Sequence, residues 1–170
     1  MNVYEFHRGR TPLLISIPHS GTELPEAIAH RLTVVGRGVP DTDLHVHQLY
    51  DFARGLGASI IKANYSRYVV DLNRSSDSAP LYVGSPTSPV CPTETFGGSF
   101  IYMAGHEPDD REIAARVDQY WRPYHERIAQ ELGALRATHG RALLWDAHSI
   151  ASEIPSLFAG VLPEFNIGTR

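Results

Sequence analysis

Cysteine and lysine are almost missing from this chain of 170 residues, since each occurs once, as Cys91 and Lys62. A single cysteine cannot form a disulfide within the chain, so the fold depends on a hydrophobic core, for which this length is sufficient, and a reducing compartment is expected. Long apolar runs are missing too, and the opening MNVYEFHRGRTP lacks a signal-peptide pattern. We therefore expect one domain over residues 1–170, in the cytoplasm and without a membrane partner.

An excess of positive charge is also absent, because 15 Lys and Arg residues face 19 Asp and Glu residues, which gives a net charge of −4. This balance argues against a nucleic acid as partner. The stretches GRG and FGG lack the spacing of a phosphate-binding loop, and the surroundings of Cys91 lack a nucleophile signature. What the sequence does contain is nine histidines, and their positions decide whether they carry chemistry.

Four runs of β-branched and large apolar residues predict buried strands. They are LLISI, ASIIKA, RYVVDL and RALLWDAH, at residues 13–17, 58–63, 67–72 and 141–148. Segments with helical spacing or with many prolines lie between them. Alternating strands and helices predict an α/β fold, with a mainly parallel sheet flanked by helices.

The first predicted helix starts near Asp43, because apolar residues recur at helical steps up to residue 56. Asp41 is the expected cap and Gly57 the expected end. His45 and His47 would lie on this helix two positions apart and point to different faces. We assign both histidines to surface or packing roles.

The longest helix should start at Asp109 or Asp110 and continue to about residue 135. Pro123 lies inside its pattern and should kink it, because proline has no backbone N–H to donate to the preceding turn. Residues 75–108 are rich in proline and show little periodicity. They predict a long functional loop.

Polar side chains follow three of the predicted strands. His19 follows the first, Asn73 and Arg74 follow the third, and His148 ends the fourth. In a parallel sheet these ends meet at one edge, where α/β folds bind ligands. Two neutral imidazoles and a carboxylate form a common zinc site, with a fourth position left for water. We predict that His19 and His148 bind zinc or another divalent metal ion.

The sequence leaves the third metal ligand open. Asp43, Asp41 and Glu23 all lie near His19 along the chain, and Asp43 is our choice. An acidic residue at position 43 is equally typical of a helix cap or first turn, where it interacts favourably with the helix dipole. The assignment therefore rests on proximity in sequence.

The remaining polar residues at these strand ends suit an acidic substrate. Arg74 and Arg67 supply planar guanidinium groups, which match a carboxylate with two parallel hydrogen bonds, and Asn73 is adjacent. Asp71 could orient an arginine or a ligand histidine from behind, and Asp146 points to the same side of its strand as the histidine two residues later. We predict substrate contacts for the first three and supporting roles for the two aspartates.

Five motifs, in this order along nearly the whole chain, resemble the N-formylglutamate amidohydrolase family. They are IPHSGTELP, DTDLHVHQLYDFA, SRYVVDLNR, CPTETFGG and LLWDAHSI. The resemblance implies a metal-dependent enzyme that hydrolyses N-formyl-L-glutamate to formate and L-glutamate, late in histidine degradation. Its partner would be a small acidic N-acyl amino acid.

The layout is more distantly similar to the zinc carboxypeptidases and to the desuccinylase and aspartoacylase enzymes, which have a phosphorylase/hydrolase-like fold. His19, His148, Asn73 and Arg74 match their metal and carboxylate positions, whereas Thr22 stands where that group has a glutamate ligand. Family members continue beyond the stretch FNIGT, and the general-base glutamate of the wider group lies in that later part.

Two expectations follow from this resemblance. The chain would be a truncated amidohydrolase domain whose general base lies beyond Arg170, and an uncovered FNIG strand at residues 165–168 would favour a homo-oligomer. Two alternatives stay open: a hydrolase of another N-acyl amino acid, and a non-catalytic module that binds metal and acid.

Overall fold

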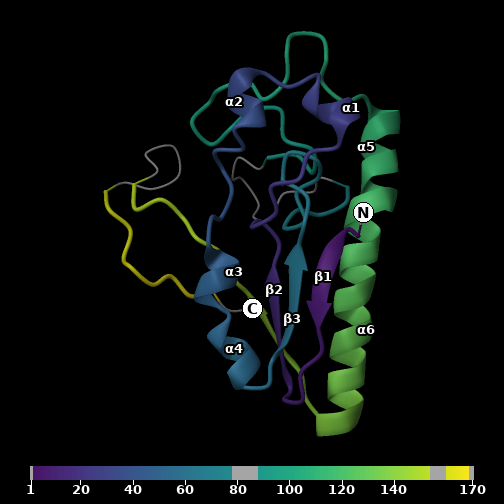
Figure 1. Cartoon of the computed structure of the whole chain (residues 1–170), viewed down its shortest axis with the longest axis vertical. Coiled ribbons are helices and arrows are strands. Elements are labelled where there is room, and N and C mark those ends of the chain that lie inside the picture. Colours follow the sequence, from purple (N-terminus) through teal and green to yellow (C-terminus); the bar gives the residue numbers. More distant parts are fainter. Residues whose placement is uncertain (1, 78–87, 154–159, 169–170) are drawn as a thin grey trace.

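The computed structural model describes residues 2–77, 88–153 and 160–168. At its centre lies a four-stranded sheet in the order β1-β3-β2-β4 (Figure 1). The strands are β1 (Tyr4–His7), β2 (Leu13–Ile17), β3 (Ser59–Ala63) and β4 (Leu143–Asp146). β2 pairs in parallel with β3 and with β4, whereas β1 is antiparallel to β3. The prediction of an α/β fold with a mainly parallel sheet is therefore confirmed, and β1 is an additional strand.

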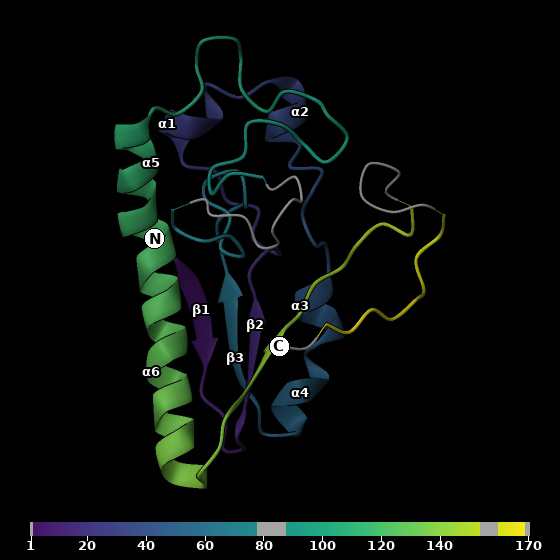
Figure 2. The ribbon, with the colours of Figure 1, turned by 180° about the vertical axis from the view of Figure 1, so that it is seen from behind.

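Helices cover the two faces of this sheet (Figures 1 and 2). On one face Ile15, Ile17 and Ile60 pack with residues of α3 (Val46–Leu49) and α4 (Phe52–Gly55). On the other face Leu14 and Ile61 pack with α6 (Arg122–His139). Two more short helices, α1 (Glu26–Ala29) and α2 (Val34–Arg37), lie beyond the carboxyl ends of the parallel strands. Neighbouring residues of β2 thus alternate between two apolar layers.

The longest helical column runs from α5 (Asp110–Arg116) through a π-helical turn, η1 (Val117–Trp121), into α6. The Asp109 carboxylate accepts a hydrogen bond from the backbone N–H of Glu112 (2.8 Å), so the predicted start is confirmed. Just before Pro123 the backbone N–H of Arg122 reaches back five residues to the carbonyl of Val117. The disturbance expected from proline takes the form of this wider turn.

Two predicted elements are wrong. Residues 67–72 form a buried turn, because their carbonyl groups accept hydrogen bonds from side chains such as Arg116 in place of a neighbouring strand. The single helix from Asp43 is broken into α3 and α4, with His45 in a left-handed conformation (φ 65°) before α3. Asp41 does not cap it, since its carboxylate accepts hydrogen bonds from Tyr68 Oη and from the backbone N–H of Phe96.

The long-loop prediction lies partly outside the described residues, which omit 78–87. Residues 88–108 contain no helix or strand and form only isolated bridges, such as Glu94 with Phe100, in agreement with the prediction. The FNIG stretch, at 165–168, is not a strand, so that expectation is wrong. Among the helices that the structure describes, none has the length and apolar character required to cross a bilayer.

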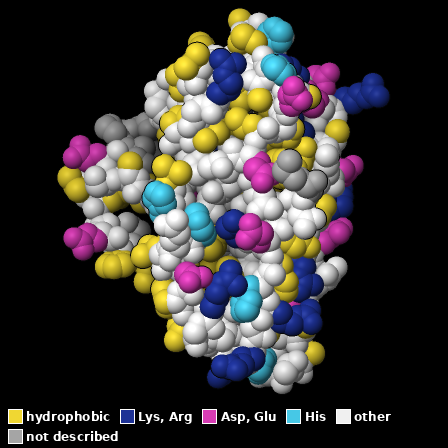
Figure 3. All heavy atoms as spheres, viewed as in Figure 1, with side chains coloured by type: hydrophobic (Ala, Val, Ile, Leu, Met, Phe, Trp, Pro, Cys, Tyr) yellow, Lys and Arg dark blue, Asp and Glu magenta, His cyan; other side chains and the backbone are white. Residues whose placement is uncertain are grey.

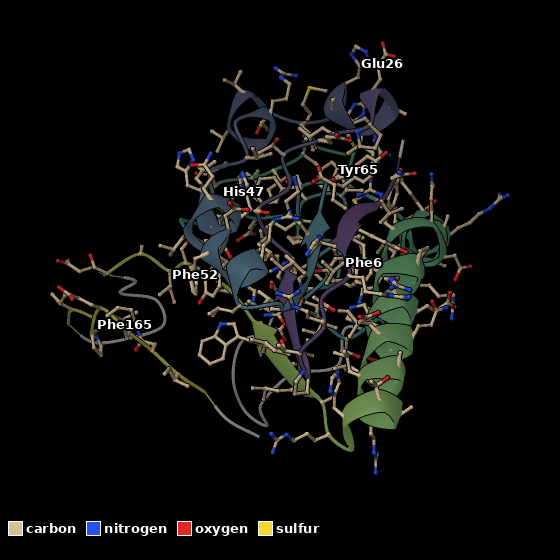
Figure 4. The ribbon with its side chains drawn as sticks, turned by 60° about the horizontal axis from the view of Figure 1, so that its bottom comes forward. Phe6, Glu26, His47, Phe52, Tyr65 and Phe165 are labelled. Carbon is tan, nitrogen blue, oxygen red and sulfur yellow. The ribbon has the colours of Figure 1, made fainter. Side chains whose placement is uncertain are left out.

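At the amino ends of the parallel strands the sheet buries a charged group. Glu131 of α6 is 2% exposed, and its carboxylate accepts hydrogen bonds from Ser59 Oγ (2.7 Å) and from Arg127 Nη2 (3.0 Å). The guanidinium of Arg127 lies 3.7 Å from the ring centre of Phe6, which faces α6 (Figure 4). This cluster ties α6 to β1 and β3.

Candidate metal centre

Three potential metal ligands meet at the carboxyl ends of the neighbouring parallel strands β2 and β4. His19 follows β2, His148 follows β4, and Asp43 is held nearby because its backbone N–H donates to the His19 carbonyl (2.9 Å). One ligand atom from each residue lies within 4.8 Å of the other two. Asp43 Oδ2 is 3.0 Å from His148 Nδ1 and 3.8 Å from His19 Nδ1. The prediction that these residues converge agrees with the geometry.

The ring of His19 is oriented from behind by a buried carboxylate. Its Nε2–H donates to Asp71 Oδ1 (2.8 Å), and Arg67 Nη2 donates to Asp71 Oδ2 (2.5 Å). All three side chains are buried, and the guanidinium of Arg67 lies over the ring of Phe96 at 4.6 Å. The Nδ1 atom of His19 is therefore left to face Asp43, in the arrangement by which carboxylates orient metal-binding histidines.

The charges of this pair follow from burial and hydrogen bonding. Burial lowers the pKa of His19 below its ordinary value, an effect that the nearby Asp71 opposes without overcoming it. Burial alone would raise the pKa of Asp71, but the hydrogen bond from His19 and the charge of Arg67 outweigh it and hold that pKa well below its usual range. His19 is thus a neutral imidazole beside an ionised carboxylate, which is the form that binds metals.

His148 closes the site on its solvent side. Its Nδ1 faces Asp43, and its Nε2 lies 3.1 Å from the amide nitrogen of Asn73. If Nδ1 binds a metal ion, the ring proton must sit on Nε2, and the Asn73 amide has to turn so that its oxygen accepts that proton. Asn73 is therefore placed to select the tautomer of His148.

The structure separates the three candidates for the third ligand. Asp43 is 5% exposed and faces both imidazoles. Asp41 is engaged with Tyr68 and the backbone of Phe96, and Glu23 is exposed in a bridge beside Tyr65. A side chain at position 21 would collide with the backbone of residues 64 and 65. Glycine at this position therefore allows the chain to pass between His19 and Glu23.

The predicted substrate-binding and supporting residues differ in their exposure and in their hydrogen-bond partners. Arg74 donates through Nε to Ser88 Oγ (3.0 Å) and through Nη1 to the carbonyl of Asn73 (3.0 Å). Arg67 is buried against Asp71, so its guanidinium is already paired. Asp146 is exposed at the end of β4. Burial lowers the pKa of His125, and the charge of Asp146 opposes this shift without overcoming it. Within the described residues no hydrogen bond joins Asp146 to the three potential ligands.

His45 and His47 both line one cavity of about 300 Å³, beside the Lys62–Glu5 ion pair. His45 has a left-handed backbone conformation just before α3. Histidines next to basic and acidic groups are visible on this face in Figure 3, and Figure 4 marks His47 on α3.

Sequence reasoning missed Arg116, a charged residue that is 3% exposed. It donates to backbone carbonyls of the turn that carries Asp71, and through Nε and Nη2 to Glu112. The available signal was its place beside the apolar stripe of the predicted helix, where a cation has to find buried acceptors.

Two imidazoles and a carboxylate fit a divalent metal ion, and the carboxyl ends of parallel strands are where open α/β sheets bind their ligands. Residues 11–170 match the model of the family described as N-formylglutamate amidohydrolase. The chain belongs to that family.

Relatives and solved structures show the extent of the likeness. The chain is 52% identical to the N-formylglutamate deformylase of Pseudomonas putida over 98% of its own length, and 52% identical to that of Pseudomonas aeruginosa over 99%. It spans 62% and 63% of the lengths of these curated relatives. The crystal structure of N-formylglutamate amidohydrolase from Ralstonia eutropha JMP134 has a similar fold, with a TM-score of 0.74, 20% identity, and coverage of 89% of this chain and 59% of that chain.

Proposed function

We propose that the chain provides the metal-binding and acid-binding part of an enzyme that hydrolyses N-formyl-L-glutamate to formate and L-glutamate. The observation that carries this proposal is the convergence of His19, Asp43 and His148 within 4.8 Å, in a chain of the N-formylglutamate amidohydrolase family. The two deformylases at 52% identity support the substrate. The place of this reaction in histidine degradation and in the cytoplasm stays a prediction.

A divalent ion, which we propose is zinc, would polarise the formyl carbonyl and lower the pKa of a water molecule in the fourth ligand position. His19 and His148 would hold it as neutral imidazoles, with Asp71 and Asn73 fixing the proton of each ring on Nε2. Arg74 would bind a glutamate carboxylate, and Arg67 would keep Asp71 ionised. Hydrolysis breaks the C–N bond, with water supplying hydroxyl to formate and a proton to the amine.

The general base is the part of the reaction that this residue set leaves unassigned. The resemblance expects it in a later part of the family's chains, and this chain spans 62% and 63% of the lengths of the curated deformylases. We therefore propose that ligand binding and turnover can be separated in this chain. A positioned acid–base group typically contributes about 10²–10⁴-fold to the rate.

Metal content and turnover, measured together on the 170-residue chain, test the proposal. We expect about one zinc per chain after reconstitution, binding of L-glutamate, and turnover of N-formyl-L-glutamate that is slow beside a chain of the relatives' full length. A metal-free protein after reconstitution would contradict the metal centre. A preference for another N-acyl amino acid in a substrate panel would replace the substrate, and metal with acid binding at no measurable turnover would favour the non-catalytic module.

A further inference from the structure

Three side chains of one helical column donate hydrogen bonds to the backbone of a single segment, residues 66–74. Arg116 Nη1 donates to the carbonyl of Val69 (3.1 Å), Trp121 Nε1 to that of Arg74 (2.9 Å), and His125 Nε2 to that of Leu72 (2.9 Å). These carbonyls lie in a turn that pairs with no strand among the residues that the structure describes. The three side chains therefore replace the donors that a neighbouring strand would supply.

The π-helical turn brings these donors to one side. On an uninterrupted α-helix, residues five apart such as Arg116 and Trp121 point about 140° away from each other. The turn at Val117–Trp121 lies between them and takes up one extra residue. The rings of Trp121 and His125 are then stacked at 3.8 Å, so two of the three donors also support each other.

The 66–74 segment carries four of the residues assigned to the site: Arg67, Asp71, Asn73 and Arg74. We propose that Arg116, Trp121 and His125 are positioning residues, which set this segment against the metal centre and the acid-binding residues. The inference rests on the proposed function. Arg116 holds the carbonyls of Tyr68 and Val69, which lie between Arg67 and Asp71, and so acts on His19. His125 and Trp121 hold the carbonyls of Leu72 and Arg74, which lie on the two sides of Asn73.

The anchor at Arg116 is itself fixed. Glu112 accepts hydrogen bonds from Arg116 and from both terminal nitrogens of Arg31 (2.9 and 2.5 Å). Arg116 Nη1 also donates to Tyr102 Oη (2.8 Å), which in turn donates to the carbonyl of Tyr68 (3.3 Å). A planar guanidinium can serve these acceptors together, which a lysine ammonium cannot.

The two arms of the test follow from this division. With competition against a chromophoric chelator, Arg116→Met should lower zinc affinity about tenfold, and Arg116→Lys should restore part of it. At saturating zinc, Trp121→Phe and His125→Leu should weaken L-glutamate binding severalfold in calorimetry, with a smaller loss of zinc affinity than in Arg116→Met. His125→Gln keeps an N–H donor and should behave like wild type. Arg122→Met, which loses an exposed pair with Asp118, is the matched control.

The helix register supplies a second test. Deleting the exposed Gln119 leaves Arg116 and Trp121 four residues apart, still on one side of an α-helix, so both affinities should be kept. Inserting an alanine after Gln119 turns them about 120° apart and should lower both affinities, with helix content unchanged in circular dichroism. Equal effects of deletion and insertion would overturn the proposal.

A purely structural role would be shown by zinc and glutamate affinities that fall in parallel with thermal stability in all three variants. If wild type binds neither zinc nor L-glutamate, the proposed function fails, and the inference is judged by amide hydrogen exchange in the metal-free chain. Arg116→Met should then speed exchange at Asp71, whose N–H donates to the carbonyl of Val90 (2.7 Å), and unchanged exchange would refute the positioning role.

Discussion

Two buried carboxylates at opposite ends of the sheet, Asp71 and Glu131, have one kind of partner in common and differ in the other. Each is paired with an arginine four residues earlier, Arg67 or Arg127. The second partner of Glu131 is the hydroxyl of Ser59, whereas that of Asp71 is the imidazole of His19. The Arg127–Glu131 pair is therefore completed by a hydroxyl in the core. The Arg67–Asp71 pair is completed by an imidazole whose other nitrogen faces potential metal ligands. In this chain the buried carboxylate at the candidate site is the one whose second partner, His19, keeps a ring nitrogen available for another ligand.

The largest effect is expected from removing either histidine of the candidate metal centre. His19→Ala or His148→Ala should abolish stoichiometric zinc binding, because two protein ligands hold the ion too weakly. Metal analysis after dialysis measures this. His139→Ala, at the exposed end of α6, is the control and should keep its zinc. Full zinc occupancy in both site variants would show that His19 and His148 do not form a metal centre.

At the other end of the sheet, Glu131→Ala should lower the free energy of unfolding by about 3 kcal/mol, since the change leaves Arg127 without its buried partner. Zinc affinity should stay the same. Urea unfolding and chelator competition separate the two quantities, and Glu126→Ala, exposed on the same helix, should change neither. A loss of zinc affinity in Glu131→Ala would mean that the two ends of the sheet are coupled.

Asp71→Asn gives the matching change at the carboxyl end. The amide keeps the size of the side chain but loses its charge, so zinc affinity should fall about 10–100-fold through the loosened orientation of His19. Titration with zinc against a competing chelator would show it. An affinity within twofold of wild type would make Asp71 a structural residue like Glu131.

The smallest effect concerns pH. Burial lowers the pKa of His125 below 6.5, so in mildly acidic solution the unfolded chain binds a proton at this position more readily than the folded chain. Stability should therefore be complete above pH 6.5 and decrease as the pH falls through 6.5 towards the lowered pKa. The difference in unfolding free energy between wild type and His125→Gln, measured from pH 7.5 to 5, should shift against wild type. A difference independent of pH would contradict the buried neutral ring.

The sequence predicted the layers of the fold and the convergence of His19 and His148 better than the buried turn at residues 67–72. Strand patterns and strand ends were sufficient for this convergence, because parallel strands bring their carboxyl ends to the same edge of a sheet. The stretch RYVVDL failed because burial, which makes a strand apolar, equally makes a buried turn apolar. What decides between them is the donor to each carbonyl, and here the donors lie 47 to 53 residues further along the chain. The pattern of residues in a single sequence does not reveal which distant side chain donates to which carbonyl.

Cys91 gives the buried turn a chemical reporter. Its thiol is 1% exposed and donates weakly to the carbonyl of Val69 (3.5 Å), and burial raises its pKa to about 11. Because the thiolate is the reactive form, a thiol reagent should modify the folded chain very slowly. Modification should occur only in molecules in which local unfolding of the turn exposes Cys91. Labelling rates then measure how often the turn that carries Asp71 opens. The one cysteine of the chain makes that opening visible without any engineered probe.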